Sequence, residues 1–349
     1  PPLPSTNTTM TGTLKYANTG ATPMQNAALA IKNWDGTAVT NTTANTSGVY
    51  SFTSFPSGNY RMNITPTHTW GGVNSTDALA ILNHFAQILP LTGMKLAAAD
   101  VNSSHSINGT DAMLVMKRYS LMISSFPAGD LLYNSSSISV NLTSGAVTNN
   151  LDMIWFGDVN ASWAPAAKTI SQVGLVYEGN LELGSDTEFE LPVRLKTGME
   201  VGAISLGFYY PEQYLEVMDA RLANGTTGFS WTAQNGLFVM GWCDMNALTV
   251  NNDEVVVILK MKTKDLSTAG SGIALELYEN CEFAEGTASP NPGAIVSIPT
   301  INAPMTGVTP GALNASLSVY PNPLNQQATV TFSLDRQSRV SIELFDMLG

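Results

Sequence analysis

The sequence predicts a mainly β, multidomain fold, and three observations support this expectation. The chain has 349 residues, and at roughly 100 to 200 residues per domain it should contain about two to four domains. Only 12% of its residues are Asp, Glu, Lys or Arg, although 44% are hydrophobic. Ser, Thr and Asn therefore supply the polarity, as they do in turns and on the solvated faces of β-sheets. We expect two β-sandwiches that flank a small α-helical module, followed by a partial C-terminal β-domain.

The charge balance and the apolar stretches exclude several classes of partner. With 27 acids and 15 bases the net charge is −12, so we expect neither nucleic acid nor anionic lipid to bind. The longest apolar stretches, such as residues 255–261, are far shorter than the ~18 residues that span a membrane. Because residue 1 is Pro rather than Met, we expect the chain to be a processed or excised piece of a longer protein.

Residues 1–65 predict a first β-sandwich. Five segments are rich in Thr, Val and aromatic residues and are separated by turn residues: 11–17, 27–32, 37–43, 48–54 and 59–65. Asp35-Gly36 is a hairpin signal. The segment resembles carboxypeptidase regulatory-like domains in residues 11–13, 47–52 and 56–60, and this resemblance implies a spacer in a surface protein.

Residues 66–165 predict a duplicated loop–helix module. Apolar residues recur at helical spacing over residues 75–88, with Ser75 or Thr76 available as N-cap, and again from Thr110. The sequences Asn-Ser-Thr-Asp-Ala (74–78) and Asn-Gly-Thr-Asp-Ala (108–112) repeat 34 residues apart.

A candidate calcium loop precedes the second of these helices. Its oxygen ligands would occupy loop positions 1, 3, 5, 7, 9 and 12, the seventh through a carbonyl: Asp100, Asn102, Ser104, Ser106, Asn108 and Asp111. Ca²⁺ takes six to eight oxygens, and this spacing points alternate side chains into a tight loop. His105 replaces the usual glycine and only two carboxylates are present, so we expect weak binding, roughly 10⁻⁴ to 10⁻³ M. The alternative is an Asx-rich turn without metal, in which Thr110 caps the helix.

The duplicated loops and helices resemble a dockerin, in which calcium loops each precede a helix. In dockerins the positions just before the last loop ligand contact the protein partner. The resemblance therefore implies docking residues in both repeats: Ser75, Thr76, Gly109 and Thr110.

The first repeat lacks the ligand pattern of the second. Pro66, His68 and Trp70 stand where the second repeat has Asp100, Asn102 and Ser104. We therefore expect the first loop to be closed by packing of Trp70 and by Gly71-Gly72 rather than by an ion.

A third Asp-x-Asn-x-Ser sequence occurs at residues 158–162, followed by Trp163. It could be half of another ion site or a cap over the first repeat, and an Asx turn is the simpler interpretation.

Residues 166–303 predict a second sandwich of about eight or nine strands. Apolar and charged residues alternate over 188–196, which gives one buried and one solvated face. This part resembles a cohesin, the sandwich that binds dockerins, in four places: residues 188–196, residues 204–217, Trp242 with Asp244, and residues 280–284.

Two features of this sandwich leave alternatives open. Four of its aromatic side chains could form a sugar-stacking platform, although aromatics in alternating strands are more often core: Tyr209, Tyr210, Trp231 and Trp242. Cys243 and Cys281 could form a disulfide worth roughly 4 kcal/mol, or remain two buried thiols.

The C-terminal part predicts a linker at 304–316 and an incomplete sheet at 317–349. Tyr320-Pro321-Asn322-Pro323 resembles the opening of a type IX secretion sorting domain. That resemblance implies export across an outer membrane, then release or attachment to the cell surface.

No catalytic motif is present in the sequence: it has no G-x-S-x-G, P-loop, H-E-x-x-H or C-x-x-C. We expect a non-enzymatic extracellular structural or adhesion protein whose dockerin-like and cohesin-like modules dock within one chain or between neighbours. A head-to-tail contact that does not close would build a filament. The alternative is a polysaccharide-binding or scaffolding component that presents an enzyme encoded elsewhere in the full chain.

Overall fold

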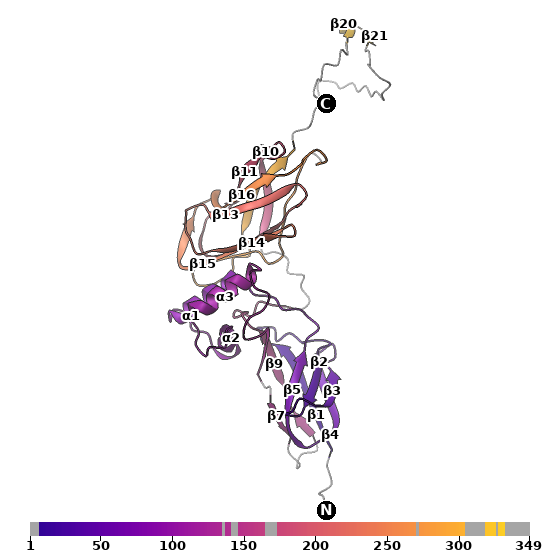
Figure 1. Ribbon diagram of the computed structural model, residues 1–349, viewed down its shortest axis with the longest axis vertical. Coiled ribbons are helices and arrows are strands. Elements are labelled where there is room, and N and C mark those ends of the chain that lie inside the picture. Colours follow the sequence, from indigo (N-terminus) through magenta and orange to yellow (C-terminus); the bar gives the residue numbers. More distant parts are fainter. Residues whose placement is uncertain are drawn as a thin grey trace, which may run out of the picture. The chain divides into compact units, whose positions relative to one another are not determined.

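The computed structural model describes residues 7–134, 137–140, 146–164, 173–269, 272–303, 318–325 and 327–331. The chain divides into two compact units, residues 1–303 and 304–349. The described residues are mainly strands, with three short helices, so the predicted fold class is confirmed (Figure 1). None of these helices is long and apolar enough to span a membrane.

The first sandwich begins with the five strands that the sequence predicts. They are β1 (Asn7–Tyr16), β2 (Ala28–Lys32), β3 (Ala38–Thr43), β4 (Val49–Pro56) and β5 (Gly58–Thr65). In β5, Tyr60, Met62 and Ile64 are buried and alternate with exposed residues, as expected for a strand with one face on a core.

Four later strands complete this sandwich: β6 (Leu131–Tyr133), β7 (Ser137–Val140), β8 (Ala146–Thr148) and β9 (Leu151–Trp155). One sheet has the order β4-β1-β9-β6, with β8 also paired to β1, and the other has the order β3-β2-β5-β7. β9 runs parallel to β1. We had expected residues 66–165 to form one loop–helix module, but their last strands lie in the first sandwich (Figure 1). The helical module is therefore an insertion between β5 and β6.

The inserted module contains α1 (Ser75–Phe85), α2 (Gly93–Ala99) and α3 (Gly109–Tyr119). α1 and α3 follow the predicted repeat, but α1 ends at Phe85 rather than Ile88, and its N-cap is Asn74 instead of Ser75 or Thr76. Both helices begin with a capping box, in which an Asn caps the helix and an Asp three residues later accepts from the backbone of that Asn. α2 has no counterpart in the sequence-based prediction.

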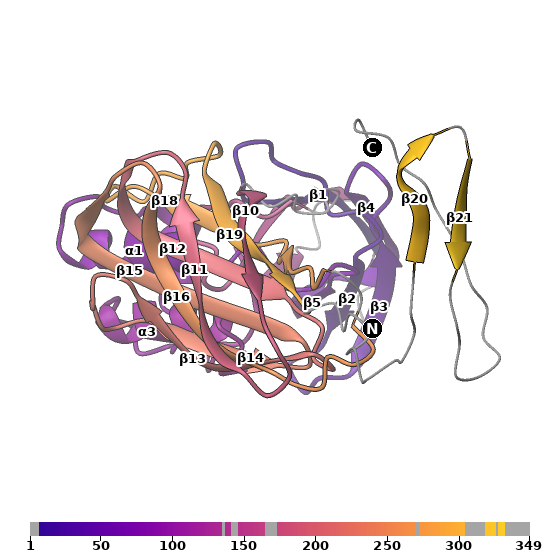
Figure 2. The same ribbon diagram turned by 90° about the horizontal axis from the view of Figure 1, so that it is seen from above.

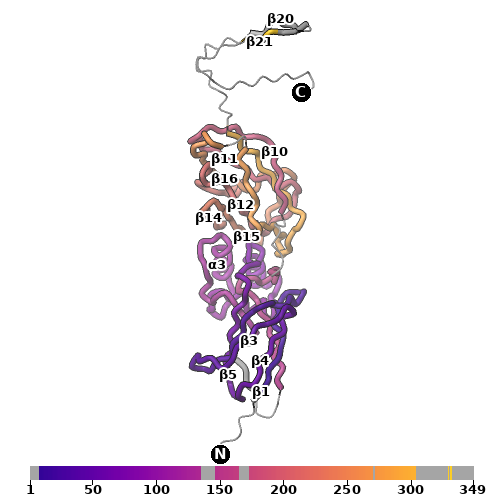
Figure 3. The backbone as a smooth tube through the Cα atoms, turned by 90° about the vertical axis from the view of Figure 1, so that its right-hand side faces the viewer, coloured from indigo at the N-terminus to yellow at the C-terminus, as the bar shows by residue number. Residues whose placement is uncertain are grey.

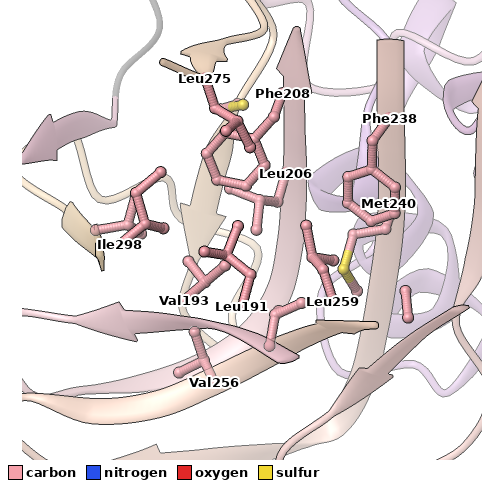
Figure 4. Close-up of a cluster of buried hydrophobic side chains, with 14 of the residues drawn as sticks. Leu191, Val193, Leu206, Phe208, Phe238, Met240, Val256, Leu259, Leu275 and Ile298 are labelled. Atoms are coloured by element: carbon pink, nitrogen blue, oxygen red, sulfur yellow. The ribbon is translucent and has the colours of Figure 1, made fainter. Parts of the chain in front are cut away.

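The described residues of the second sandwich form ten strands: β10 (Gly174–Glu182), β11 (Glu188–Leu195), β12 (Met199–Tyr209), β13 (Leu215–Leu222), β14 (Ser230–Gln234), β15 (Leu237–Val250), β16 (Glu254–Thr263), β17 (Glu276–Leu277), β18 (Glu282–Ala284) and β19 (Ile295–Asn302). One sheet has the order β10-β19-β11-β16-β13. The other has the order β14-β15-β12-β17, and β18 also pairs with β12. Leu191, Leu206, Phe208 and Phe238 meet in the core between the two sheets (Figure 4).

The second unit contains a described antiparallel hairpin of β20 (Ser318–Asn325) and β21 (Gln327–Thr331). The Tyr-Pro-Asn-Pro sequence lies in β20. The predicted linker at 304–316 and residues 332–349 of the predicted incomplete sheet lie outside the described residues.

Candidate docking interface and cation loops

α1 and α3 lie across the sheet of the second sandwich that contains β12, β14 and β15 (Figures 2 and 3). We call this contact the docking interface. At its centre Leu79 of α1, fully buried, packs against Ala203 and Ala284 of the sandwich. A Cβ added at Gly241 would lie 2.7 Å from Ser75 Oγ. Only a glycine at this position of β15 allows α1 to approach so closely.

The N-terminus of α1 makes polar contacts at the centre of the docking interface. Ser75 N donates to Ser205 Oγ at 2.9 Å, and the Thr76 hydroxyl donates to the Glu282 carboxylate. Asn74 Nδ2 donates to the same Glu282 oxygen at 3.2 Å. Burial raises the pKa of Glu282, and these hydrogen bonds offset part of that shift.

Further hydrogen bonds lie around this centre. Tyr119 OH donates to Asn280 O at 3.0 Å, and Asn83 Nδ2 donates to Gly286 O at 3.0 Å. Asn280 and Glu282 belong to the segment 280–284 in which the sequence resembles a cohesin.

The predicted docking residues divide between two environments. Ser75 and Thr76 are fully buried in the docking interface. Gly109 and Thr110, their counterparts at the start of α3, are exposed. The structure thus brings only the first pair to the sandwich.

The predicted calcium loop at residues 100–111 forms a compact Asx-type turn followed by the capping box of α3. Ser104 N donates to Asp100 Oδ1 at 2.9 Å and to Asn102 Oδ1 at 2.8 Å. Ser104 Oγ donates to Ser106 O at 3.1 Å. Asn108 accepts from Thr110 N through Oδ1 at 2.8 Å, which caps the helix.

The environment of the Asp111 carboxylate, at the last position of this loop, shows whether a cation fits there. Its side chain is fully buried, and Oδ2 accepts from Asn108 N at 3.0 Å. Oδ1 is buried and accepts no hydrogen bond from the residues that the structure describes. Burial raises the pKa of Asp111, and the Asp100 carboxylate adds to the shift. An unpaired buried carboxylate oxygen is costly unless a cation binds it, so the loop fits Ca²⁺.

A second loop with the same geometry is assembled from two distant segments. Residues 158–163, which follow β9, supply positions 1 to 6, and residues 72–77, which lead into α1, supply positions 7 to 12. We call these two segments the split loop and residues 100–111 the continuous loop. The hydrogen bonds of the Asx-type turn, of positions 5 to 7 and of the capping box correspond between the two loops.

Three hydrogen bonds illustrate this correspondence. Ser162 N donates to Asp158 Oδ1 at 2.9 Å and to Asn160 Oδ1 at 2.8 Å, as Ser104 N does in the continuous loop. Ser162 Oγ donates across the break to Gly72 O at 3.0 Å. Ala161 and Ser103, both at position 4, have φ angles of 58° and 57°.

Gly72 has a φ of +80°, and a Cβ there would lie 2.6 Å from Trp163 Cβ and 2.9 Å from Asp158 Oδ2. The two halves therefore meet at van der Waals distance. The expectation that Trp70 closes the first repeat is wrong, because the segment 158–163 closes it. Trp70 instead donates to Phe156 O and stacks at 4.0 Å on the Arg118 guanidinium.

The split loop concentrates negative charge in the interior. Asp77 and Asp158 are both fully buried, and neither forms an ion pair among the described residues. Burial raises the pKa of Asp77, and the Asp158 carboxylate raises it further. Asn160 N donates to Asp77 Oδ1 at 3.1 Å, and Tyr16 OH donates to Asp158 Oδ2 at 2.5 Å.

Neither loop has the ligands of a transition-metal site. Within the described ranges, no group of three or more His, Cys, Asp or Glu side chains could hold a metal. Both loops mix carboxylate, amide, hydroxyl and carbonyl oxygens, which is the donor set of a hard cation.

The positions of the side chains decide two alternatives for the second sandwich, the aromatic platform and the disulfide between Cys243 and Cys281. Trp242 is 1% exposed in the core and Trp231 packs at 6.0 Å on Phe238, so the four aromatics do not form one platform. Cys243 and Cys281 are not bonded to each other. Burial raises the pKa of the Cys243 thiol to about 12.

Comparison with known proteins identifies the helical module. Residues 71–119 match the dockerin type I domain. No curated protein matches the chain. Dockerin type I domains generally bind calcium and occur in extracellular proteins.

Comparison with solved structures finds several cohesins. The non-cellulosomal cohesin of Archaeoglobus fulgidus is 20% identical with a TM-score of 0.30, and covers 37% of this chain and 89% of its own. CaCohA2 of Clostridium acetobutylicum is 17% identical with a TM-score of 0.32 and the same coverage. The pilin subunit BcpA of Bacillus cereus is 10% identical with a TM-score of 0.30, and covers 85% of this chain and 69% of its own. Likenesses this weak say nothing about function. The chain contains a dockerin type I module at residues 71–119.

Proposed function

We propose that this chain is a non-enzymatic extracellular structural protein in which the dockerin module binds the cohesin-like sandwich of the same polypeptide. The observation that carries the proposal is the docking interface, where Ser75 and Thr76 meet Ser205 and Glu282. Dockerin and cohesin-like modules have a role in protein–protein docking. Here both lie in one compact unit, residues 1–303.

Internal docking would turn two sandwiches into one stiff body. The dockerin module is inserted in the first sandwich and packs on the second, so it joins them through a buried contact. If the same contact forms between neighbouring chains, each molecule offers one module and one sandwich. Such a head-to-tail contact leads to a filament unless it closes.

Calcium would strengthen the dockerin module. Asp100, Asn102, Ser104, Asn108 and Asp111, with the carbonyl of Ser106, would hold one ion. In the split loop, Asp158, Asn160, Ser162, Asn74, Asp77 and the carbonyl of Gly72 occupy the equivalent positions. A bound ion would neutralise carboxylates that burial otherwise makes costly. The resemblance of Tyr320-Pro321-Asn322-Pro323 to a sorting domain supports export by type IX secretion, with adhesion at the cell surface as the role.

The test of internal docking is to separate the two halves of the chain without changing the interface. A protease site replaces residues 165–172, and the cleaved protein is analysed by size-exclusion chromatography. We expect residues 1–164 and 173–303 to elute together. Leu79→Glu, which places a charge at the centre of the interface, should separate them. Ile88→Glu is the matched control, because Ile88 is 61% exposed. Separation of the unmutated halves would refute internal docking.

Self-association has its own measurement. Sedimentation of the intact chain with Ca²⁺ should show a monomer if docking is internal and concentration-dependent polymers if modules are exchanged between chains. In the second case Leu79→Glu should abolish the polymers. A monomer at every concentration would refute the filament.

A further inference from the structure

The second sandwich contains a cleft that the docking interface does not use. It has a volume of about 440 Å³, within the ~300 to 1,000 Å³ of typical ligand sites. Its lining is mostly aromatic and apolar, with one carboxylate: Tyr209, Tyr210, Pro211, Tyr214, Ile273 and Glu276. These residues come from the end of β12, the turn that follows it and the segment leading into β17.

The cleft remains open while the helices are docked. Tyr209 and Ser205 lie on the same face of β12, because side chains alternate along a strand. Ser205 is fully buried under α1, whereas Tyr209 is 38% exposed. A ligand in the cleft would therefore lie beside the dockerin module and would not compete with it.

The rings of Tyr209 and Tyr214 are anchored through their hydroxyls. Tyr209 OH donates to Glu279 Oε2 at 2.9 Å, and its ring packs edge-on against Tyr278 at 5.9 Å between centroids. Tyr214 OH donates to Thr268 O at 3.2 Å. Rings anchored at both ends lose little conformational entropy when a ligand stacks on them.

Two polar groups of the cleft have no partner in the part of the chain that the structure describes. The Glu276 carboxylate is exposed and forms neither a hydrogen bond nor an ion pair. The Tyr210 hydroxyl likewise makes no hydrogen bond, although Tyr210 is only 9% exposed. The cleft thus offers an acceptor and a hydroxyl beside aromatic faces.

We propose that this cleft binds a neutral saccharide. A sugar ring has a C–H face, which the negative face of an aromatic ring attracts, and hydroxyl groups that can donate to Glu276. Anionic ligands are disfavoured, because Glu212, Glu216 and Glu279 lie close to the cleft tyrosines. A proline-rich peptide would also stack on tyrosine, but proline has no N–H to donate to Glu276.

Titration of the intact chain with cellohexaose, mannohexaose and chitohexaose tests the proposal. At least one should bind, and Tyr209→Ala should weaken that binding by about tenfold or more. Glu276→Ala should also weaken it, while Glu276→Gln, which keeps an acceptor, should weaken it less. Trp34→Ala is the matched control, because Trp34 is a 56% exposed aromatic of the first sandwich.

Three results would overturn the saccharide site. They are no binding of any of the three oligosaccharides, unchanged binding by both Tyr209→Ala and Glu276→Ala, or binding of a polyproline peptide with none of the sugars. Thermal unfolding of each variant shows whether it is folded. Glu276 is exposed and has no hydrogen-bond or ion-pair partner among the described residues, so Glu276→Ala keeps the test valid if Tyr209→Ala is unstable. Internal docking is measured separately and is unaffected by either outcome.

Discussion

The continuous loop and the split loop share the hydrogen bonds of the Asx-type turn, of positions 5 to 7 and of the capping box, although their segments are connected differently. In one, residues 100–111 follow each other; in the other, positions 1 to 6 come from residues 158–163 and positions 7 to 12 from residues 72–77. Each half is locally determined: the first by an Asx-type turn, the second by a capping box. The comparison shows that the peptide bond between positions 6 and 7 is dispensable when a scaffold holds both halves.

The two loops differ most in their surroundings. Asp158 is fully buried and accepts from Tyr16 OH, Ser162 N and Trp163 N, whereas its counterpart Asp100 is half-buried. The first sandwich therefore holds the two halves of the split loop together, whereas the peptide chain itself connects the two halves of the continuous loop. Stability should respond more to changes in the split loop.

The largest expected difference comes from removing the first carboxylate of each loop. In chelator, Asp158→Ala should lower the free energy of unfolding by about 2 to 4 kcal/mol, because buried donors lose their acceptor. Asp100→Ala should cost about 1 kcal/mol, since water can replace its contacts. Urea unfolding measures both. Equal losses would mean that burial does not distinguish the loops.

The next largest effect is expected at the contact between the two segments of the split loop. Gly72→Ala should cost about 1 to 3 kcal/mol, because φ is positive and the new Cβ would clash with Trp163. Gly109→Ala is the control: a Cβ there meets nothing within 4 Å, and the change should stay within about 0.5 kcal/mol. Thermal unfolding in chelator compares the two, and a tolerated Gly72→Ala would show that the halves can move apart.

Calcium binding should stabilise the module through each loop that holds an ion. At ~10 mM Ca²⁺ and the expected weak affinity, each occupied loop should add about 1 to 3 kcal/mol to the free energy of unfolding. Asp111→Asn should remove the Ca²⁺-dependent stabilisation that comes from the continuous loop. Asp77→Asn should remove the stabilisation that comes from the split loop. The readout is the Ca²⁺-induced rise in thermal midpoint. If Asp77→Asn leaves the rise unchanged, only the continuous loop binds an ion.

The smallest effect is the pH dependence of the docking interface. Burial raises the folded-state pKa of Glu282, so its contribution to stability is present below its unfolded value, near ~4.3, and is lost as pH rises through the folded value. Stability in chelator should therefore fall from pH 4 towards neutrality. Glu282→Gln should reduce this fall by about 1 kcal/mol or less. If the stability of Glu282→Gln falls as much as that of the unmutated chain, the pH dependence comes from Asp77 and Asp158 instead.

Local signals in the sequence predicted much of this structure. β1 to β5 followed from segments rich in Thr, Val and aromatic residues between turn signals, β11 from alternation, and α1 and α3 from helical spacing. The Asp-x-Asn-x-Ser sequence at 158–162 was visible as a possible half site. Its other half could not be predicted, because β6 to β9 separate it from α1 and only tertiary structure joins them.

Other misses have similar causes. β9 pairs in parallel with β1, and a hairpin signal predicts only neighbouring antiparallel strands. Asn74, Ser75 and Thr76 are all good N-caps, so local preference did not select Asn74. α2 was missed because its seven residues are too short for a periodic pattern.

The insertion of the dockerin module between β5 and β6 also decides how the first sandwich carries load. A pull between Asn7 and the segment after Trp155 acts on the start of β1 and the end of β9, which are parallel neighbours. Their backbone hydrogen bonds then break together in shear rather than one after another. Because α1 and α3 lie outside this path, a pull on these two points would leave the helices unstretched.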